Sequence, residues 1–280
     1  MVLYLMTFGS FQKICHTIQR LERLLEHDAE YFHKLRHSSW IAVTFIFSFV
    51  MTQITMTLYH HRRTNWFTFL AYISGDLSLV YPMTGYCLFF ISALALAASF
   101  QHVNSMLARY LQRSVSKVVL ANSLDLAEIR THHGLVCQAV DQLNGIFQSL
   151  SFIHVVFAFT GVVNMSFMLL TRQYFLPKVI LYQLECIARL GLLGYVCDRI
   201  HFQALACLKT LACFRCGIII TSHSLLHQQE RVLLGNQVLQ TAPTFDVYGL
   251  FHLRRQLLPK LIGTTISYLV ILYQFKGTSM

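Results

Sequence analysis

The chain has 280 residues, of which 55% are hydrophobic and only 12% are charged, whereas about 25% of the residues in a typical soluble domain are charged. With 4 Pro, 13 Gly and 8 Cys, the composition excludes collagen-like, disordered and disulfide-scaffold proteins. We therefore expect an all-α fold, a polytopic membrane helix bundle. The formal net charge of +10 then reflects where basic residues lie relative to lipid and does not indicate nucleic-acid binding.

Five apolar stretches approach the length of about 20 residues that a helix needs to cross a bilayer. They cover Trp40–Tyr59, Leu77–Phe100, Ile146–Leu170, Val179–Val196 and Leu261–Phe275. The last stretch is the shortest and reaches full length only if Gln256–Lys260 continues it. Its Ser and Thr residues favour a position inside a bundle over direct contact with lipid.

Basic residues gather on alternate segments between these spans. The segments 1–39, 101–145 and 197–260 contain 5, 4 and 7 of the 22 Lys and Arg residues, and the intervening segments contain 5. Lys and Arg are enriched on the cytoplasmic side of membrane proteins. We therefore expect a multi-pass protein of the cell membrane with a cytoplasmic N-terminus and an extracellular C-terminus.

The segments expected on the cytoplasmic side have helical character. Residues 101–133 contain no Pro or Gly, so the second span is expected to continue as a helix beyond the membrane. Asn122 or Ser123 can cap a new helix, and Asp125 in its first turn suits the helix dipole. That helix leads into the third span, and residues 203–240 are expected to form helix packed against other helices below the membrane.

No arrangement of residues that would support catalysis is visible in the sequence. It has no Gly-rich phosphate loop, no HExxH and no Ser or Cys nucleophile signature, so we expect neither an enzyme nor a bound cofactor. Cys213 and Cys216 form a lone CxxC without a second pair at zinc-site spacing, and we expect no metal site.

Two charged residues lie near the middle of the fourth span. Glu185 and Arg189 are four residues apart and therefore share a helix face. A single charge is costly at this depth, so we expect the two to form an intramembrane charge pair. Two interpretations remain open: a self-neutralising pair inside the bundle, or a role in a water-filled ligand pocket or gate.

The last span carries polar residues at helical spacing. Ser267, Ile271 and Gln274 fall on one face, and Tyr268 and Phe275 fall on another. An amide near the outer end of an apolar helix needs a partner or water. By itself this pattern is compatible with a pore lining or with a helix–helix contact.

The same span carries a motif. The run Ser267–Phe275, SYLVILYQF, resembles the Thr-Tyr, five apolar residues, Gln-Phe signature of insect gustatory receptors. The runs Phe245–Phe251 and Leu143–Phe147 resemble the lead-in to that family's last helix and the start of its fifth helix. The departures are Ser267 in place of the usual Thr, and Asp246 where Thr or a small residue is common.

This resemblance covers about residues 13–280 and implies a tetrameric cation channel whose pore is lined by the last helix of each subunit. The family has seven spans and this chain shows five, so its first helix and nearly all of its second are expected to be missing. Sugar-sensing members commonly carry Glu directly after the motif Tyr. Leu269 stands there in this chain, which implies a non-sugar, bitter-like ligand.

The resemblance also implies roles for individual residues. Ser267, Ile271 and Gln274 are expected to line the pore, whereas Tyr268 and Phe275 are expected to pack against neighbouring helices. The implied partners are membrane lipid, a small-molecule tastant, permeant cations and other gustatory receptor subunits in a homo- or heterotetramer, without nucleic acid.

The chain is expected to have four parts. They are a cytoplasmic segment with the remnant of a preceding helix (1–39), a bundle of four transmembrane helices with a cytoplasmic helical loop (40–200, loop 101–145), cytoplasmic anchor helices (201–253), and the pore-lining helix with a short extracellular tail (254–280). The leading hypothesis is a ligand-gated cation channel subunit for taste detection. The alternative is a truncated, non-conducting remnant or a modulatory subunit of intact receptors.

Overall fold

A computed structural model of the chain describes residues 80–115, 123–171, 176–215 and 225–278, together with isolated positions between 16 and 58. The predicted span Trp40–Tyr59 lies largely outside the described residues, as does most of the segment 1–39.

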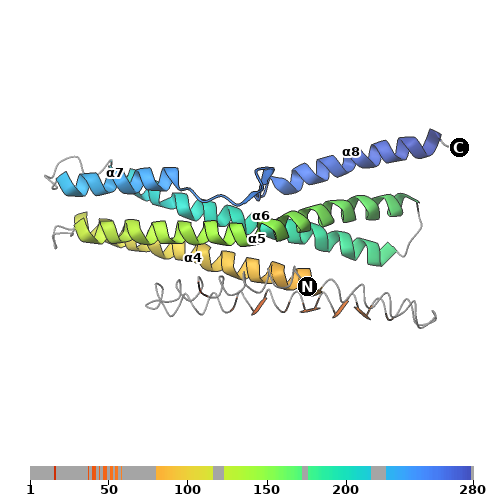
Figure 1. Cartoon of the computed structure of the whole chain (residues 1–280), viewed down its shortest axis with the longest axis horizontal. Coiled ribbons are helices and arrows are strands. Elements are labelled where there is room, and N and C mark those ends of the chain that lie inside the picture. The colour runs from red at the N-terminus through yellow and green to blue at the C-terminus, as the bar shows by residue number, and fades with distance from the viewer. Residues whose placement is uncertain are drawn as a thin grey trace. The chain divides into compact units, whose positions relative to one another are not determined.

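The described part of the chain is helical apart from one small hairpin (Figure 1). Its elements are α4 (Val80–Val115), α5 (Ser123–Thr171), α6 (Leu176–Arg215), α7 (Leu225–Gln240), β1 (Asp246–Val247), β2 (Phe251–His252) and α8 (Leu257–Thr278). The two strands pair antiparallel, with Asp246 opposite His252 and Val247 opposite Phe251. The all-α fold class predicted from the composition is confirmed, and the hairpin was not predicted.

The helices continue well past the predicted spans. α4 has 36 residues, so the second span extends as one helix to Val115, as the absence of Pro and Gly after residue 100 predicted. α5 has 49 residues, so the third span is preceded by a long helical segment, which was expected from the cap and the early carboxylate. α5 begins at Ser123, with Asp125 in its first turn. Both features were expected, because a Ser cap and an early carboxylate satisfy the free amides and the dipole at a helix start.

Three described helices are long and apolar enough to cross a membrane: Gly85–Gln112, Asp125–Asn164 and Leu257–Phe275. The predicted span 179–196 lies in α6, where several side chains fall outside the described set, and it stays a prediction.

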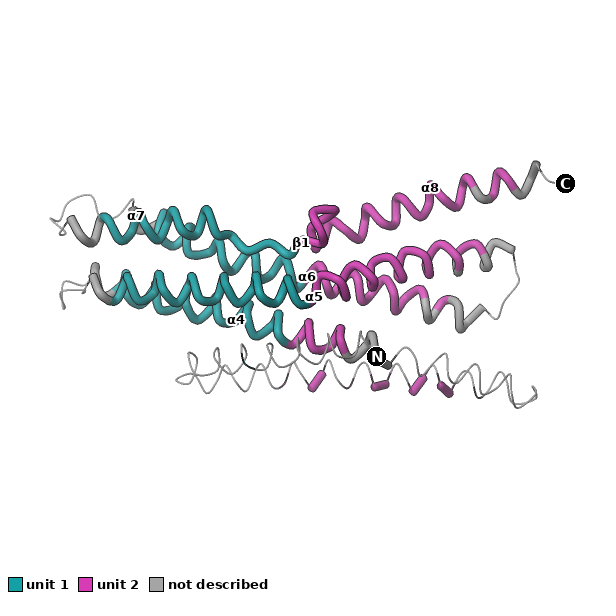
Figure 2. The backbone as a smooth tube through the Cα atoms, viewed as in Figure 1, with its two compact units in different colours: residues 1–35, 92–146, 196–245 teal, residues 36–91, 147–195, 246–280 magenta. Residues whose placement is uncertain are grey.

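The chain divides into two compact units (Figure 2). Unit 1 consists of residues 1–35, 92–146 and 196–245, and unit 2 of residues 36–91, 147–195 and 246–280. The helices α4, α5 and α6 each contribute residues to both units, whereas α7 belongs to unit 1 and α8 to unit 2.

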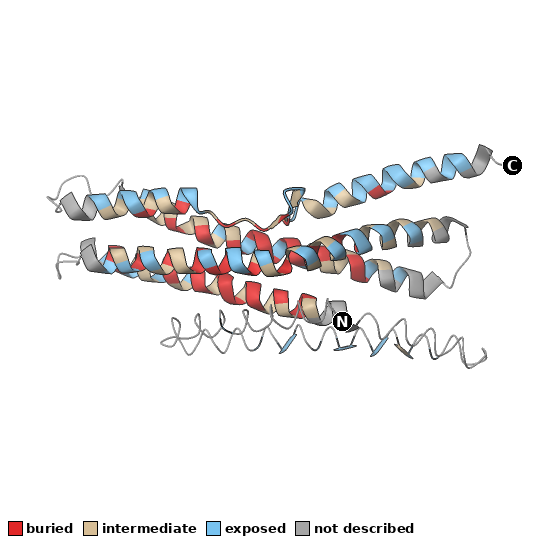
Figure 3. Ribbon diagram, viewed as in Figure 1, coloured by how far each residue is buried: buried red, intermediate tan, exposed pale blue. Residues whose placement is uncertain are grey.

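Unit 1 has a continuous apolar core. The described helices α4, α5, α6 and α7 all contribute fully buried side chains to it, which include Phe100, Leu107, Leu126, Val140, Ile200, Leu234 and Val238. The buried residues on these helices appear as red bands in Figure 3. Burial of large apolar side chains, at about 1.5–3 kcal/mol each, accounts for the packing of this unit.

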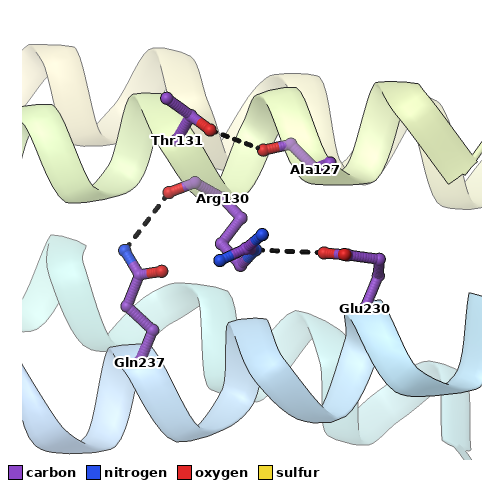
Figure 4. A network of polar contacts seen from close by, with 5 residues as sticks. All are labelled: Ala127, Arg130, Thr131, Glu230 and Gln237. Atoms are coloured by element: carbon purple, nitrogen blue, oxygen red, sulfur yellow. Dashed lines mark hydrogen bonds and ion pairs between the residues drawn. The ribbon is translucent and has the colours of Figure 1, made fainter.

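Polar contacts tie the helices of unit 1 together (Figure 4). The Arg130 guanidinium on α5 lies 3.0 Å from the Glu230 carboxylate on α7, and the Gln237 amide donates to the Arg130 carbonyl at 3.2 Å. Asn104 on α4 donates to the Gln203 carbonyl on α6 at 2.8 Å. Because the Arg130–Glu230 pair is partly exposed, it contributes about 0–1 kcal/mol and mainly fixes orientation.

Candidate functional site

Helix α8 is the most exposed apolar helix of the described chain. Only 6% of its most apolar stretch is buried, compared with 61% for the stretch in α4. Figure 3 shows α8 mostly exposed, and among its described side chains only Thr265 is buried. A helix this apolar requires lipid or protein around it.

One face of α8 is turned towards the rest of unit 2. Thr265 is 5% exposed, and Leu258, Leu261 and Leu269 are half-buried. At about 100° per residue these four positions share one side of the helix. They therefore mark the face that packs on the chain itself.

The predicted pore residues lie on the opposite side. Ser267, Ile271 and Gln274 are all exposed, Ile271 at 48%. The same stripe includes Thr264, which is exposed. Because α8 begins at Leu257, four residues before the predicted span, the stripe also extends towards the helix N-terminus to Lys260, which is exposed too. The five positions fall within about 80° of helix arc, on the side of α8 opposite Thr265.

Two hydroxyls on this stripe are satisfied within the helix. Thr264 donates to the Lys260 carbonyl at 2.9 Å, and Ser267 donates to the Gly263 carbonyl at 3.1 Å. This i to i−4 bonding lets a hydroxyl sit in an apolar helix without a partner elsewhere. The oxygen lone pairs can still accept from water on the exposed side.

The aromatic motif residues lie beside the stripe. The Tyr268 ring meets the Phe159 ring of α5 edge to face at 6.0 Å. Tyr268 remains 51% exposed and Phe275 70% exposed in a single chain. Their expected packing against neighbouring helices, like the pore lining, stays a prediction.

Glu185 and Arg189 lie in direct contact within α6. The Glu185 side chain is 3% exposed and that of Arg189 is 18% exposed. Tyr86 of α4 donates its hydroxyl to the Arg189 carbonyl at 3.0 Å, and its ring meets the His154 ring of α5 at 6.1 Å. The pair therefore lies where α4, α5 and α6 meet in unit 2, and Tyr86 and His154 are members of this cluster that the sequence analysis missed.

A hairpin connects α8 to the other helices of unit 2. Its turn places Tyr248 at φ 53° and Gly249 at φ 70°, the left-handed backbone typical of a tight hairpin turn. The Tyr248 and Ser149 hydroxyls are hydrogen-bonded at 2.5 Å, and the Tyr248 ring meets Phe152 at 5.9 Å. Asp246 closes the hairpin by accepting from the Gly249 amide at 2.6 Å.

The segment between the hairpin and α8 lies directly on α6. A Cβ atom at Gly194 would be 2.8 Å from the Arg254 carbonyl oxygen, so only Gly fits there. The Arg255 guanidinium lies over the Tyr195 ring, 4.7 Å from its centroid, a favourable cation–π geometry. The residues just before α8 therefore pack directly against α6.

The described residues contain no group of three or more His, Cys, Asp or Glu side chains that could hold a metal ion. Burial raises the pKa of the Cys207 thiol to about 12, which disfavours the thiolate, the form of cysteine that acts as a nucleophile or metal ligand.

Long apolar helices with an exposed terminal helix define an all-α membrane helix bundle. The family profile of the 7tm Chemosensory receptor matches residues 1–278, and the chain belongs to this family. This confirms the family resemblance read from the terminal motif. A search of curated proteins gave no match to the chain.

Proposed function

We propose that this chemosensory receptor is a gustatory subunit that forms a ligand-gated cation channel, with α8 of each subunit around a central pore. One observation carries the proposal. The stripe from Lys260 to Gln274 is exposed, while Thr265 on the opposite side of α8 is buried. A central axis shared by several copies would place this stripe against water.

A tetramer would also cover much of the apolar surface that α8 exposes in one chain. Ile262, Ile266 and Tyr268 are 43%, 57% and 51% exposed. Contacts with adjacent subunits and lipid would remove these side chains from water. The constriction would lie at Ile271 and Gln274, because apolar rings gate by dewetting and an amide can replace part of an ion's hydration.

Ligand binding would act through the contacts of the hairpin. A small, non-sugar compound between the outer ends of α4, α5 and α6 would favour one packing of these helices over another. Tyr248 and Phe152 connect α5 to the hairpin, and Gly194 and Tyr195 connect α6 to the base of α8. A change in α5 or α6 would therefore shift α8. In the cell membrane the N-terminus would be cytoplasmic and the C-terminus extracellular, following the basic-residue asymmetry.

The proposal is tested by whole-cell recording from cells that express the chain alone or with an intact family member. Bitter compounds from a test panel should evoke a cation current, whereas sugars should not. Gln274→Ala should change conductance or ion selectivity while leaving the amount of assembled protein nearly unchanged. Current seen only on co-expression would indicate a modulatory subunit, and the absence of current in both settings would support the non-conducting alternative.

A further inference from the structure

Lys260 is the only ionisable residue of the exposed stripe. Its charge lies in the first turn of α8, which contains no acidic residue. A cation in the first turn opposes the helix dipole, so helix formation does not explain its presence there. The side chain is exposed.

Lys260 lies on the same face of α8 as the predicted pore residues. Thr264, Ser267 and Ile271 follow it at spacings of four, three and four, which keeps all of them on one side of the helix. The neighbouring cations differ in this respect. Arg254 and Arg255 precede α8, and Arg255 is positioned on the Tyr195 ring of α6.

The carboxylates described in unit 2 are both engaged elsewhere. Glu185 contacts Arg189, and Asp246 lies 3.3 Å from His252 and accepts from the Gly249 amide. Neither is placed to neutralise Lys260. Among the residues that the structure describes, Lys260 forms no ion pair, and its side chain is exposed.

We propose that Lys260 forms the cytoplasmic charge filter of the ion path, a ring of ammonium groups that lowers cation entry from the cytosol. This inference rests on the proposed function, because it requires α8 to line a pore with its first turn on the cytoplasmic side. Four like charges around a water-filled mouth lower the local concentration of a monovalent cation, by roughly three- to ten-fold at physiological salt. Outward cation current through open channels is therefore smaller than inward current at equal driving force.

The test is the ratio of outward to inward current in inside-out patches with symmetrical salt. Lys260→Gln should raise this ratio roughly three- to ten-fold, and Lys260→Arg should leave it unchanged because the charge is kept. Raising the salt on the cytosolic side should weaken the wild-type rectification, because screening shortens the reach of the charge. Lys209→Gln removes an exposed cation of unit 1 and is the matched control, with no expected effect.

A second variant makes the test independent of side-chain size. In Lys260→Cys, a positively charged thiol reagent applied to the cytosolic face should restore rectification, and a negatively charged reagent should reverse it. If the wild-type chain conducts and the Lys260→Gln variant rectifies to the same degree, the charge filter is overturned and the channel proposal stays intact. Absence of wild-type current would overturn the channel proposal and this inference with it, and accessibility from the extracellular side alone would overturn the assigned orientation.

Discussion

Gly194→Ala tests whether the base of α8 is held by direct contact with α6. The added Cβ atom would lie 2.8 Å from the carbonyl oxygen of Arg254, 2.9 Å from its carbonyl carbon and 3.0 Å from the Arg255 nitrogen. All three are backbone atoms, which cannot rotate away as a side chain can. The segment before α8 must therefore shift, and overpacking of this kind costs about 1–3 kcal/mol.

Gly191→Ala is the matched control on the same helix. A Cβ atom there would meet only the Leu258 side chain, at 3.7 Å, an ordinary van der Waals distance. Both substitutions gain about 1 kcal/mol of helix propensity, which cancels when the two variants are compared. The difference in unfolding free energy between them should therefore be about 1–3 kcal/mol, with Gly194→Ala the less stable.

The assay is thermal unfolding of the purified full chain, followed by recording of ligand-evoked current. Gly194→Ala should melt below Gly191→Ala, by about 2–4 °C for each kcal/mol of difference, and should show an altered ligand response. Equal melting temperatures and equal responses for the two variants would refute the contact between α6 and the base of α8.

Three further outcomes are expected. Glu185→Gln should reduce the amount of folded, surface-expressed protein, because it leaves the Arg189 cation buried without its partner, which costs about 3–5 kcal/mol. Adding Arg189→Gln should recover part of this loss. Equal loss in the single and double variants would mean that the two residues are not coupled. Gly249→Ala should destabilise the hairpin by about 1–2 kcal/mol, because residue 249 has a φ of 70°. The variant should therefore have a lower melting temperature, and an unchanged melting temperature would contradict the left-handed turn. An epitope after Met280 should stain on intact cells and one near Asn122 should not; the reverse pattern would remove the topology.

Features that depend on nearby residues could be predicted from the sequence. The start of α5 was expected from a cap at Asn122 or Ser123 and the early carboxylate Asp125. The continuation of α4 past residue 100 was expected because residues 101–115 contain no Pro or Gly. The contact between Glu185 and Arg189 follows from their i, i+4 spacing. In each case the residues that determine the outcome lie within one or two helical turns.

Contacts between distant segments could not be predicted in this way. The hydrogen bond from Tyr86 to the Arg189 carbonyl joins positions 103 apart, and no periodicity in either helix indicates it. The close approach of Gly194 to Arg254 is of the same kind. The hairpin has no Asn-Gly or Asp-Gly turn signal, and its strands have two residues each, too few to show alternation.

The role assigned to Lys260 depended on where α8 begins. The apolar stretch itself starts at Leu261, and the sequence allowed Gln256–Lys260 to continue it without requiring this. α8 begins at Leu257, which places Lys260 inside the helix and on the same face as Ile271.

The most direct test of the central claim is the accessibility of single cysteines along α8 in conducting channels. Ile271→Cys and Gln274→Cys should be modified by a small water-soluble thiol reagent, with block of the current. Tyr268→Cys and Phe275→Cys should be protected, because neighbouring helices in the proposed tetramer would cover these positions. Modification at 268 with protection at 271 and 274 would contradict the account and place the ion path on another face of the helix.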